Sequence, residues 1–250
     1  MSSLSEPVIH YEDNHLIVVE KPAGMLTQAD ASGDISLMDV VKEYIKVQYN
    51  KPGKVFLGMV HRLDKPVSGI IMFAKTSKAA SRLSRSISSR EVIKLYLALV
   101  KISDRNVQCI HNNGQWTILH HHLLRKGDLS ILIDRPGNTT REASLSFKTL
   151  TSNSEYALLL VNLHTGRKHQ IRAQLAHAGL PIVNDTKYGA LREGPTGQIG
   201  LHACYLSINH PTQKVPFDFF SSPPDFFKER ITTRSLYKLI NDNTDELRYI

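Results

Sequence analysis

The most informative stretch of this sequence is His61-Arg62-Leu63-Asp64-Lys65-Pro66-Val67-Ser68-Gly69-Ile70. Its first half is polar and contains a proline, which indicates a turn, and the apolar run at about 69–74 predicts a buried strand. A side chain in such a turn can be held rigidly at the edge of a cleft. Asp64 lies between Arg62 and Lys65, so the local chemistry fits either a catalytic carboxylate or a structural ion pair at a turn.

Further strands and helices are predicted on both sides of this stretch. They are strands at 15–20, 69–74, 94–100 and 156–163, helices at 37–47, after Thr76 and at 169–178, and antiparallel hairpins within 101–150. Many of the connections between strands resemble hairpins rather than helical crossovers. The sequence therefore predicts an α+β fold with a mixed, mainly antiparallel central sheet flanked by helices.

The size of the chain predicts one large domain. It has 250 residues, of which 41% are hydrophobic and 22% charged, as in ordinary globular proteins. No stretch has the composition of a long linker, so we expect a single domain over 1–250. Its core would cover about 8–220, and 221–250 would form a C-terminal, helical extension.

Composition also points to a compartment and to a class of partner. Two cysteines, Cys109 and Cys204, suit a reducing environment, and no apolar run approaches the ~20 residues of a spanning helix. With no secretory signal at the N-terminus, we expect a cytoplasmic protein without membrane contact. The 31 Lys and Arg against 23 Asp and Glu give a net charge of +8, which favours polyanionic partners such as nucleic acid.

A second candidate site lies in the segment 163–172, where a strand, a glycine turn and the start of a helix follow one another. Arg167, Lys168 and Arg172 lie close together there. A helix N-terminus attracts anions, and arginine adds bidentate donors, so a phosphate or carboxylate partner fits this segment. The alternative for Lys168 and Arg172, four residues apart, is a solvated helix face.

The usual motifs for nucleotide, metal and acyl-transfer chemistry are missing from the sequence. It has no GxxxxGK[ST] or GxGxxG loop, no HExxH and no GxSxG. The triplet 120–122 is His-His-His, but neighbouring side chains of a strand point to opposite faces, and no acidic or thiol ligand clusters nearby in sequence. We therefore expect neither a metal nor another cofactor.

Several motifs together resemble the RluA-type RNA pseudouridine synthases. In chain order they are 11–24, His61-Arg62-Leu63-Asp64 with Ser68-Gly69, Lys94-Leu95-Tyr96-Leu97-Ala98, 166–172, Leu201-His202-Ala203 and His210-Pro211. The resemblance runs from about residue 8 to 220, nearly the whole chain. It implies a mixed sheet flanked by helices with a central catalytic cleft, and a single catalytic domain without the N-terminal RNA-binding domain of many relatives.

The resemblance also implies roles for individual residues. Asp64 would be the catalytic aspartate, Tyr96 would lie against the flipped uracil, and Arg167 would be the basic partner of Asp64. The residues implied to bind substrate or RNA are His61, Arg62, Lys168, Ile171 and Arg172, with Arg62 at the flipped base and Ile171 in the pocket wall. Further phosphate contacts are expected from Lys78, Arg82, Arg85 and Lys187.

Three positions depart from the family's common pattern. Val67 stands where a threonine is usual, and Lys168 and Gln174 replace the commoner threonine and histidine. None of these is the proposed Asp, Tyr or Arg, so the departures bear on turn geometry and substrate choice.

We therefore predict a monomeric, cofactor-independent pseudouridine synthase that acts on tRNA or rRNA. One alternative is a non-catalytic RNA-binding or chaperone protein, which would tolerate Asp64→Asn. The other is a hydrolase of phosphorylated small molecules with Gly166 and Arg167 as its anion site, which would need no RNA.

Overall fold

The computed structural model describes the chain except for residues 1–5, 104–106, 111–113, 233–235 and 248–250. The chain divides into two compact units, and each unit is built from two separate segments. The first consists of Met1–Ile93 and Tyr205–Ser221, and the second of Lys94–Cys204 and Ser222–Ile250. The single domain expected from the length of the chain stays a prediction.

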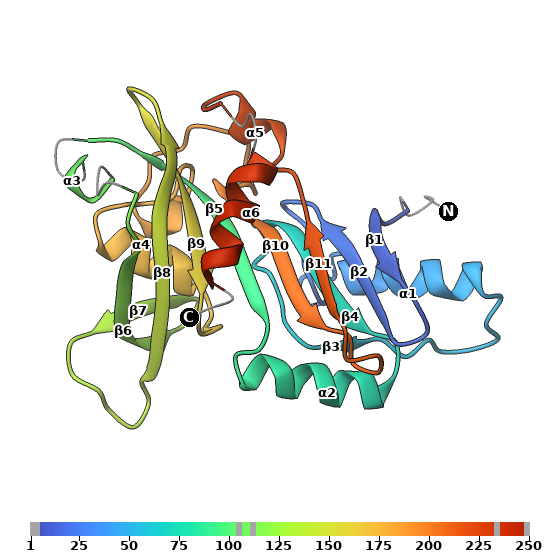
Figure 1. The fold of residues 1–250 in the computed structure, drawn as a ribbon. Coiled ribbons are helices and arrows are strands. Elements are labelled where there is room, and N and C mark those ends of the chain that lie inside the picture. The colour runs from blue at the N-terminus through green and yellow to red at the C-terminus, as the bar shows by residue number, and fades with distance from the viewer. Residues whose placement is uncertain (1–5, 104–106, 111–113, 233–235, 248–250) are drawn as a thin grey trace. The chain divides into compact units, whose positions relative to one another are not determined.

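The first unit contains a set of paired strands (Figure 1). They are β1 (Ile9–Glu12), β2 (Leu16–Lys21), β3 (Gly58–Met59), β4 (Ser68–Ala74), part of β10 (Leu201–Asn209) and β11 (Pro216–Phe220). Strands β2 and β4 pair from Leu16 opposite Ala74 to Lys21 opposite Gly69. Every residue of β4 is buried, as the apolar run predicted. This register brings the end of β2 beside the start of β4, where the loop containing Asp64 ends.

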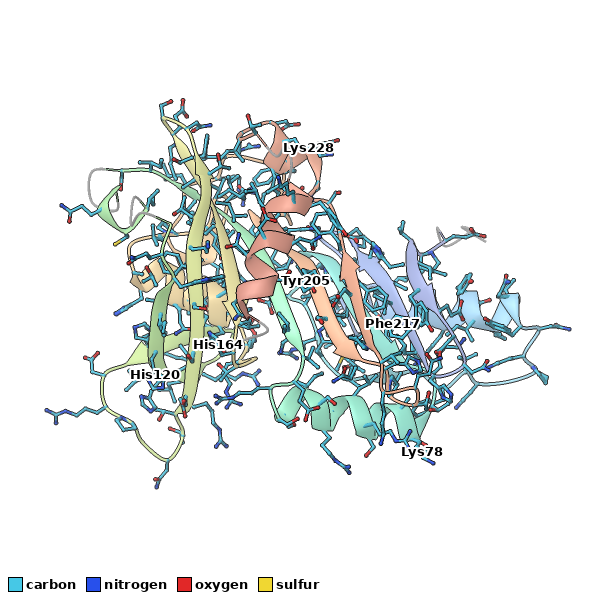
Figure 2. The ribbon with its side chains drawn as sticks, in the orientation of Figure 1. Lys78, His120, His164, Tyr205, Phe217 and Lys228 are labelled. Carbon is cyan, nitrogen blue, oxygen red and sulfur yellow. The ribbon has the colours of Figure 1, made fainter. Side chains whose placement is uncertain are left out.

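Two helices complete the first unit. Helix α1 (Leu37–Gln48) begins at Ser36, which forms a capping box with Asp39, and α2 (Ser77–Ser88) is capped by Thr76. Helix α2 buries Ala79 and Leu83 in a core that also holds strand residues of β2, β4, β10 and β11. Phe217 packs against this core, whereas the exposed Lys78 extends from α2 (Figure 2).

The second unit is built around five antiparallel strands in the order β5-β9-β8-β6-β7. Their bounds are β5 (Ile93–Lys101), β6 (Thr117–Lys126), β7 (Leu129–Ile133), β8 (Arg141–Ser152) and β9 (Tyr156–Leu163). The helical segments are α3 (Val107–Ile110), α4 (Gln170–His177), the short 3-10 helix η1 (Thr186–Tyr188), α5 (Asp225–Lys228) and α6 (Leu236–Leu247). Hairpins were predicted within 101–150. Strands β6 and β7 form one, whereas β8 pairs with β6 rather than with β7.

Helix α4 packs on one face of this sheet. Ala173 of α4 lies in a small core with Leu123 of β6 and Ala143 of β8. The expected α+β class with a mixed, mostly antiparallel sheet is confirmed, while the central catalytic cleft stays a prediction from the resemblance. Among the described residues, no helix has the length and apolar character needed to cross a bilayer.

Candidate functional site

The loop that carries Asp64 is tethered to the end of β2 by a buried lysine. The Lys21 side chain is fully buried, and its Nζ donates to the carbonyl oxygens of Pro22 at 2.9 Å, Met25 at 2.6 Å and Lys65 at 3.1 Å. The Lys65 carbonyl also accepts from the Gly24 amide at 2.8 Å. One ammonium group therefore joins the turn after β2 to the residue that follows Asp64.

A threonine fixes the other side of the same loop. Thr27 Oγ1 donates to the Leu63 carbonyl at 2.8 Å and accepts from the Leu63 amide at 3.2 Å. The Asp64 carbonyl accepts from the Val67 amide at 3.0 Å, which closes a turn. Since both neighbours of Asp64 are held, the half-buried carboxylate is carried on a rigid segment.

The charges around Asp64 differ from those that the sequence suggested. Lys65, one of its flanking cations, donates to Asp34 Oδ2 at 2.7 Å, and this hydrogen bond raises the pKa of Lys65. Desolvation lowers the pKa of Lys21 to about 7, and the negative charge of Asp64 opposes that shift. Lys21, a lysine at the end of a strand that sequence reasoning passed over, is thus a cation whose pKa the charge of Asp64 affects. Its only signal was a charged residue closing a β-branched run before Pro22.

His61, Arg62 and Val67 belong to the same loop, between β3 and β4. The His61 ring nitrogen Nε2 accepts from the Met72 amide at 3.1 Å, which ties the start of the loop to β4. Arg62 is exposed, and Val67, whose amide donates to the Asp64 carbonyl, is buried. His61 therefore has a structural contact of its own, and Arg62 has the exposure that an RNA contact requires.

Tyr96 belongs to the second unit and lies on β5 opposite Val161 of β9. Its side chain is only 6% exposed. Lys94 is two residues earlier on the same strand, and alternation places the two side chains on the same face of the sheet. The motif Lys94-Leu95-Tyr96 thus presents an ammonium and a phenol side by side.

The turn before α4 is organised by Gln170. Its Oε1 accepts from the Arg167 amide at 3.0 Å and from Thr165 Oγ1 at 2.7 Å, while its Nε2 donates to the Ser144 carbonyl at 3.0 Å. Arg167 is exposed, and its Nε donates to the Glu142 carbonyl at 3.1 Å. A buried amide therefore fixes the turn on which Arg167 is displayed.

The remaining predicted residues of the second unit have different surroundings. Ile171 is 5% exposed on the first turn of α4, and Lys168 Nζ lies 3.2 Å from Asp128 Oδ1. Arg172 is buried, and its guanidinium donates to both oxygens of the buried Asp185 at 2.7 and 2.8 Å. The Nε and Nη2 donors of Arg172, which a phosphate contact would need, are thus bound to Asp185. We therefore assign Arg172 the role of holding α4 to the segment that contains Asp185.

The histidine triplet divides between the two faces of β6, as alternation predicted. His120 Nε2 lies 3.0 Å from Glu142 Oε1, whereas His121 Nδ1 lies 3.0 Å from the amide nitrogen of Gln174. His164, labelled in Figure 2, bonds to Ser146 Oγ at 3.1 Å. No group of three His, Cys, Asp or Glu side chains that could hold a metal ion occurs in the parts of the chain described.

Comparison with known proteins identifies the family to which this chain is similar. Residues 15–177 match the family model described as RNA pseudouridylate synthase. The chain is 29% identical over 236 residues to ribosomal large subunit pseudouridine synthase D of Pseudomonas aeruginosa, covering 88% of this chain and 69% of the relative. It is 30% identical to ribosomal large subunit pseudouridine synthase C of Vibrio parahaemolyticus (83% and 62%) and 28% identical to tRNA pseudouridine synthase C of Pectobacterium carotovorum (83% and 57%).

Solved structures support the same fold. Human RNA pseudouridylate synthase domain containing 4 superposes with a TM-score of 0.71 at 22% identity, covering 93% of this chain and 92% of that one. Human RNA pseudouridylate synthase domain containing 1 gives a TM-score of 0.64 at 23% identity, covering 90% and 86%. The chain spans 57–69% of the length of the three curated relatives, so their complete activities do not transfer by similarity alone.

Proposed function

The chain belongs to the RNA pseudouridylate synthase family, and we propose that it converts uridines of structured tRNA or rRNA to pseudouridine with Asp64 as its essential carboxylate. The family match carries this proposal, because it covers the segment that contains Asp64, Tyr96 and Arg167. The curated relatives include both ribosomal large subunit and tRNA enzymes, in line with the RluA-type resemblance.

The reaction is an isomerisation. The bond from N1 of uracil to C1′ of the ribose breaks, the base turns, and C5 forms a bond to the same carbon, while the proton on C5 is lost and N1 gains one. No group is donated from outside and no electrons are transferred. The chain therefore needs a carboxylate at the ribose and a site that retains the detached base.

Asp64 suits the first requirement. As a carboxylate it would act either as a nucleophile at C1′ or as a base at C2′, and both roles need an ionised group at a fixed position. The bonds from Lys21 to Lys65 and from Thr27 to Leu63 hold the two neighbours of Asp64. Such a rigid loop favours catalysis, because a carboxylate held in its productive geometry does not have to be ordered during the reaction.

The second requirement falls to residues that can hold an unstacked base. A uridine must leave its stack to react, which costs a few kcal/mol, and a side chain that fills the gap offsets part of this. We propose that Arg62 fills the gap, since a guanidinium can stack and donate hydrogen bonds at once. Tyr96 would then stack on the uracil, a contact worth about 1–3 kcal/mol.

We propose a monomeric, cofactor-independent enzyme of the cytoplasm in which both units form one catalytic domain. Arg167 would be the basic residue of the active site, as the family resemblance implies. Substitution of each residue tests these roles separately.

The test is a map of pseudouridines in cells with and without the gene. Carbodiimide labelling followed by primer extension on total tRNA and rRNA should lose one or more stops in the deletion strain. A plasmid with the wild-type gene should restore them, and one with Asp64→Asn, which keeps the shape and removes the charge, should not. An unchanged map in the deletion strain, or full restoration by Asp64→Asn, would refute the proposal.

A further inference from the structure

Lys94 is a cation without a partner among the residues that the structure describes. It lies at the start of β5 and is half-buried, yet its Nζ makes no hydrogen bond or ion pair with any of the residues that the structure describes. The other lysine of this strand, Lys101, is exposed and bound to Glu193 Oε1 at 2.7 Å. The two ends of one strand thus carry lysines in opposite situations.

The position of Lys94 costs the folded protein stability. Withdrawing an ammonium from water without a counter-charge is unfavourable, and burial accordingly lowers the pKa of Lys94. A methionine at this position would fill similar volume without that penalty. An uncompensated charge of this kind suggests that its partner is a ligand.

Lys94 Nζ is directed toward a glycine turn. It lies 4.0 Å from the position that a Cβ on Gly166 would occupy, and Gly166 is exposed. Arg167, the next residue, adds a second positive charge, and its Nη groups make no hydrogen bond within the described chain. The Gly166 turn is therefore exposed, and within the described chain, apart from the chain neighbours of Gly166, Lys94 Nζ is the one atom that lies within 4.0 Å of that Cβ position.

The charge of the second unit is consistent with an anionic ligand there. This unit holds 18 of the 31 Lys and Arg and 12 of the 23 Asp and Glu, and so carries +6 of the net charge of +8. A desolvated ammonium is best compensated by a full negative charge, which a uracil carbonyl does not supply and a phosphodiester does. Glycine at position 166 leaves room for the backbone of a nucleic acid to approach closely.

We propose that Lys94 Nζ binds a phosphodiester group of the substrate RNA beside the Gly166 turn. This assignment rests on the proposed function only in taking RNA as the substrate. It makes Lys94 a substrate-binding residue on the strand that also carries Tyr96.

The test measures binding and stability together. The probe is a fluorescein-labelled 24-nucleotide hairpin RNA, because the phosphate contribution does not depend on sequence. In anisotropy titrations from 50 to 200 mM KCl, Lys94→Met should weaken binding at 50 mM by about 10- to 100-fold, the value of one charge-assisted bond. It should also reduce the slope of log K against log salt by about 0.7–0.9, the contribution of one phosphate.

Three variants sharpen the measurement. Lys94→Arg should restore the slope, and Lys101→Met, on the same strand, should leave it unchanged. Gly166→Asp places a carboxylate within ion-pair reach of Nζ and should weaken RNA binding, and Lys94→Met in that background should cause little further loss. Lys94→Met should keep or raise the melting temperature, whereas a purely structural lysine would lower it.

The outcomes separate this proposal from the proposed function. An unchanged slope in Lys94→Met, or an equal loss in Lys101→Met, overturns the phosphate assignment. A lower rate at saturating RNA with unchanged affinity also overturns it, since Lys94 would then act on the reaction rather than on binding. Pseudouridine formation by the wild type is measured in a separate experiment. If the phosphate assignment of Lys94 fails, the measurement of pseudouridine formation is unaffected. The hairpin titration in turn measures RNA binding even if no pseudouridine is formed.

Discussion

Lys21 offers the most stringent test of how the Asp64 loop is held. Because desolvation lowers its pKa to about 7, the folded protein releases this proton well before the unfolded chain, whose lysine titrates near 10.5. Between these values the unfolded state binds more protons, so the free energy of unfolding rises with pH. For a folded pKa of about 7, the contribution of Lys21 should grow by about 1 kcal/mol from pH 6 to pH 8 and by about 3 kcal/mol to pH 9.

The perturbation is Lys21→Met, which removes the titrating group and the donor to the Pro22, Met25 and Lys65 carbonyls. The variant loses the hydrogen bonds but is also relieved of a desolvated charge, so the two effects oppose one another at pH 6. Above pH 7 the wild type gains stability and the variant does not. The difference between the two proteins should therefore widen by about 3 kcal/mol between pH 6 and pH 9.

Urea unfolding at pH 6, 7, 8 and 9 measures this difference directly. Lys46→Met, at an exposed lysine on α1, controls for the loss of a positive charge as such. Asp64→Asn gives an independent check, because the charge of Asp64 supports the protonated form of Lys21. In that variant the rise should begin at a lower pH than in the wild type. The wild type and Lys21→Met could instead differ in free energy of unfolding by the same amount at every pH from 6 to 9. That result would refute the account of Lys21 as a desolvated cation whose pKa Asp64 affects.

Three further results are expected. Asp64→Asn should lower the rate of pseudouridine formation by at least about 10²–10⁴-fold, measured as single turnovers on the mapped RNA, and a rate within threefold of wild type would contradict its catalytic role. Thr27→Val removes the hydroxyl that donates to the Leu63 carbonyl and accepts from the Leu63 amide, so it should lower the free energy of unfolding by about 1–3 kcal/mol. It should also reduce the rate of pseudouridine formation more than the affinity for RNA. A loss of RNA affinity alone would argue against a role of Thr27 in positioning the loop. Asp185→Asn leaves the buried Arg172 without its counter-charge and should destabilise the protein by about 3–5 kcal/mol in thermal melts, while Arg172→Leu with Asp185→Leu should recover part of that loss. If the double variant reduced the slope of log K for RNA binding against log salt, Arg172 would be a phosphate contact, as the resemblance implied.

The sequence predicted an element correctly where its apolar residues followed a single pattern, either a continuous run or helical spacing. The apolar run at 69–74 became β4, whose residues are all buried, and the helix predicted at 37–47 became α1. Turn residues within 101–150 indicated hairpins, but β6 pairs with β8 through residues 18 to 30 positions apart, and no local pattern specifies that pairing. Residues 205–221 belong to the same unit as the N-terminal segment, a long-range association that no local pattern encodes.

Charged side chains were the part of the site that sequence predicted least well. Arg172 and Lys168 looked alike in the sequence, yet one is buried against Asp185 and the other lies at the surface near Asp128. Lys65 lies beside Asp64 in the chain but is bonded to Asp34, whereas Lys21, more than forty residues away, is the lysine whose pKa responds to Asp64. A charge finds its partner through the tertiary fold, so sequence neighbours are a poor guide to ion pairs.

Lys21 and Lys94 show two different uses of a buried cation. Lys21 is desolvated, but three carbonyl oxygens accept its bonds, so its burial fixes the geometry of the loop around Asp64. Lys94 is half-buried without any such acceptor in the described chain, so its burial fixes nothing within the protein. Replacing each by methionine should consequently act in opposite directions on stability at pH 8, lowering it at position 21 and maintaining or raising it at position 94. If both substitutions lowered stability, or both raised it, the hydrogen bonds of a buried lysine would not show whether it positions a loop or binds a ligand.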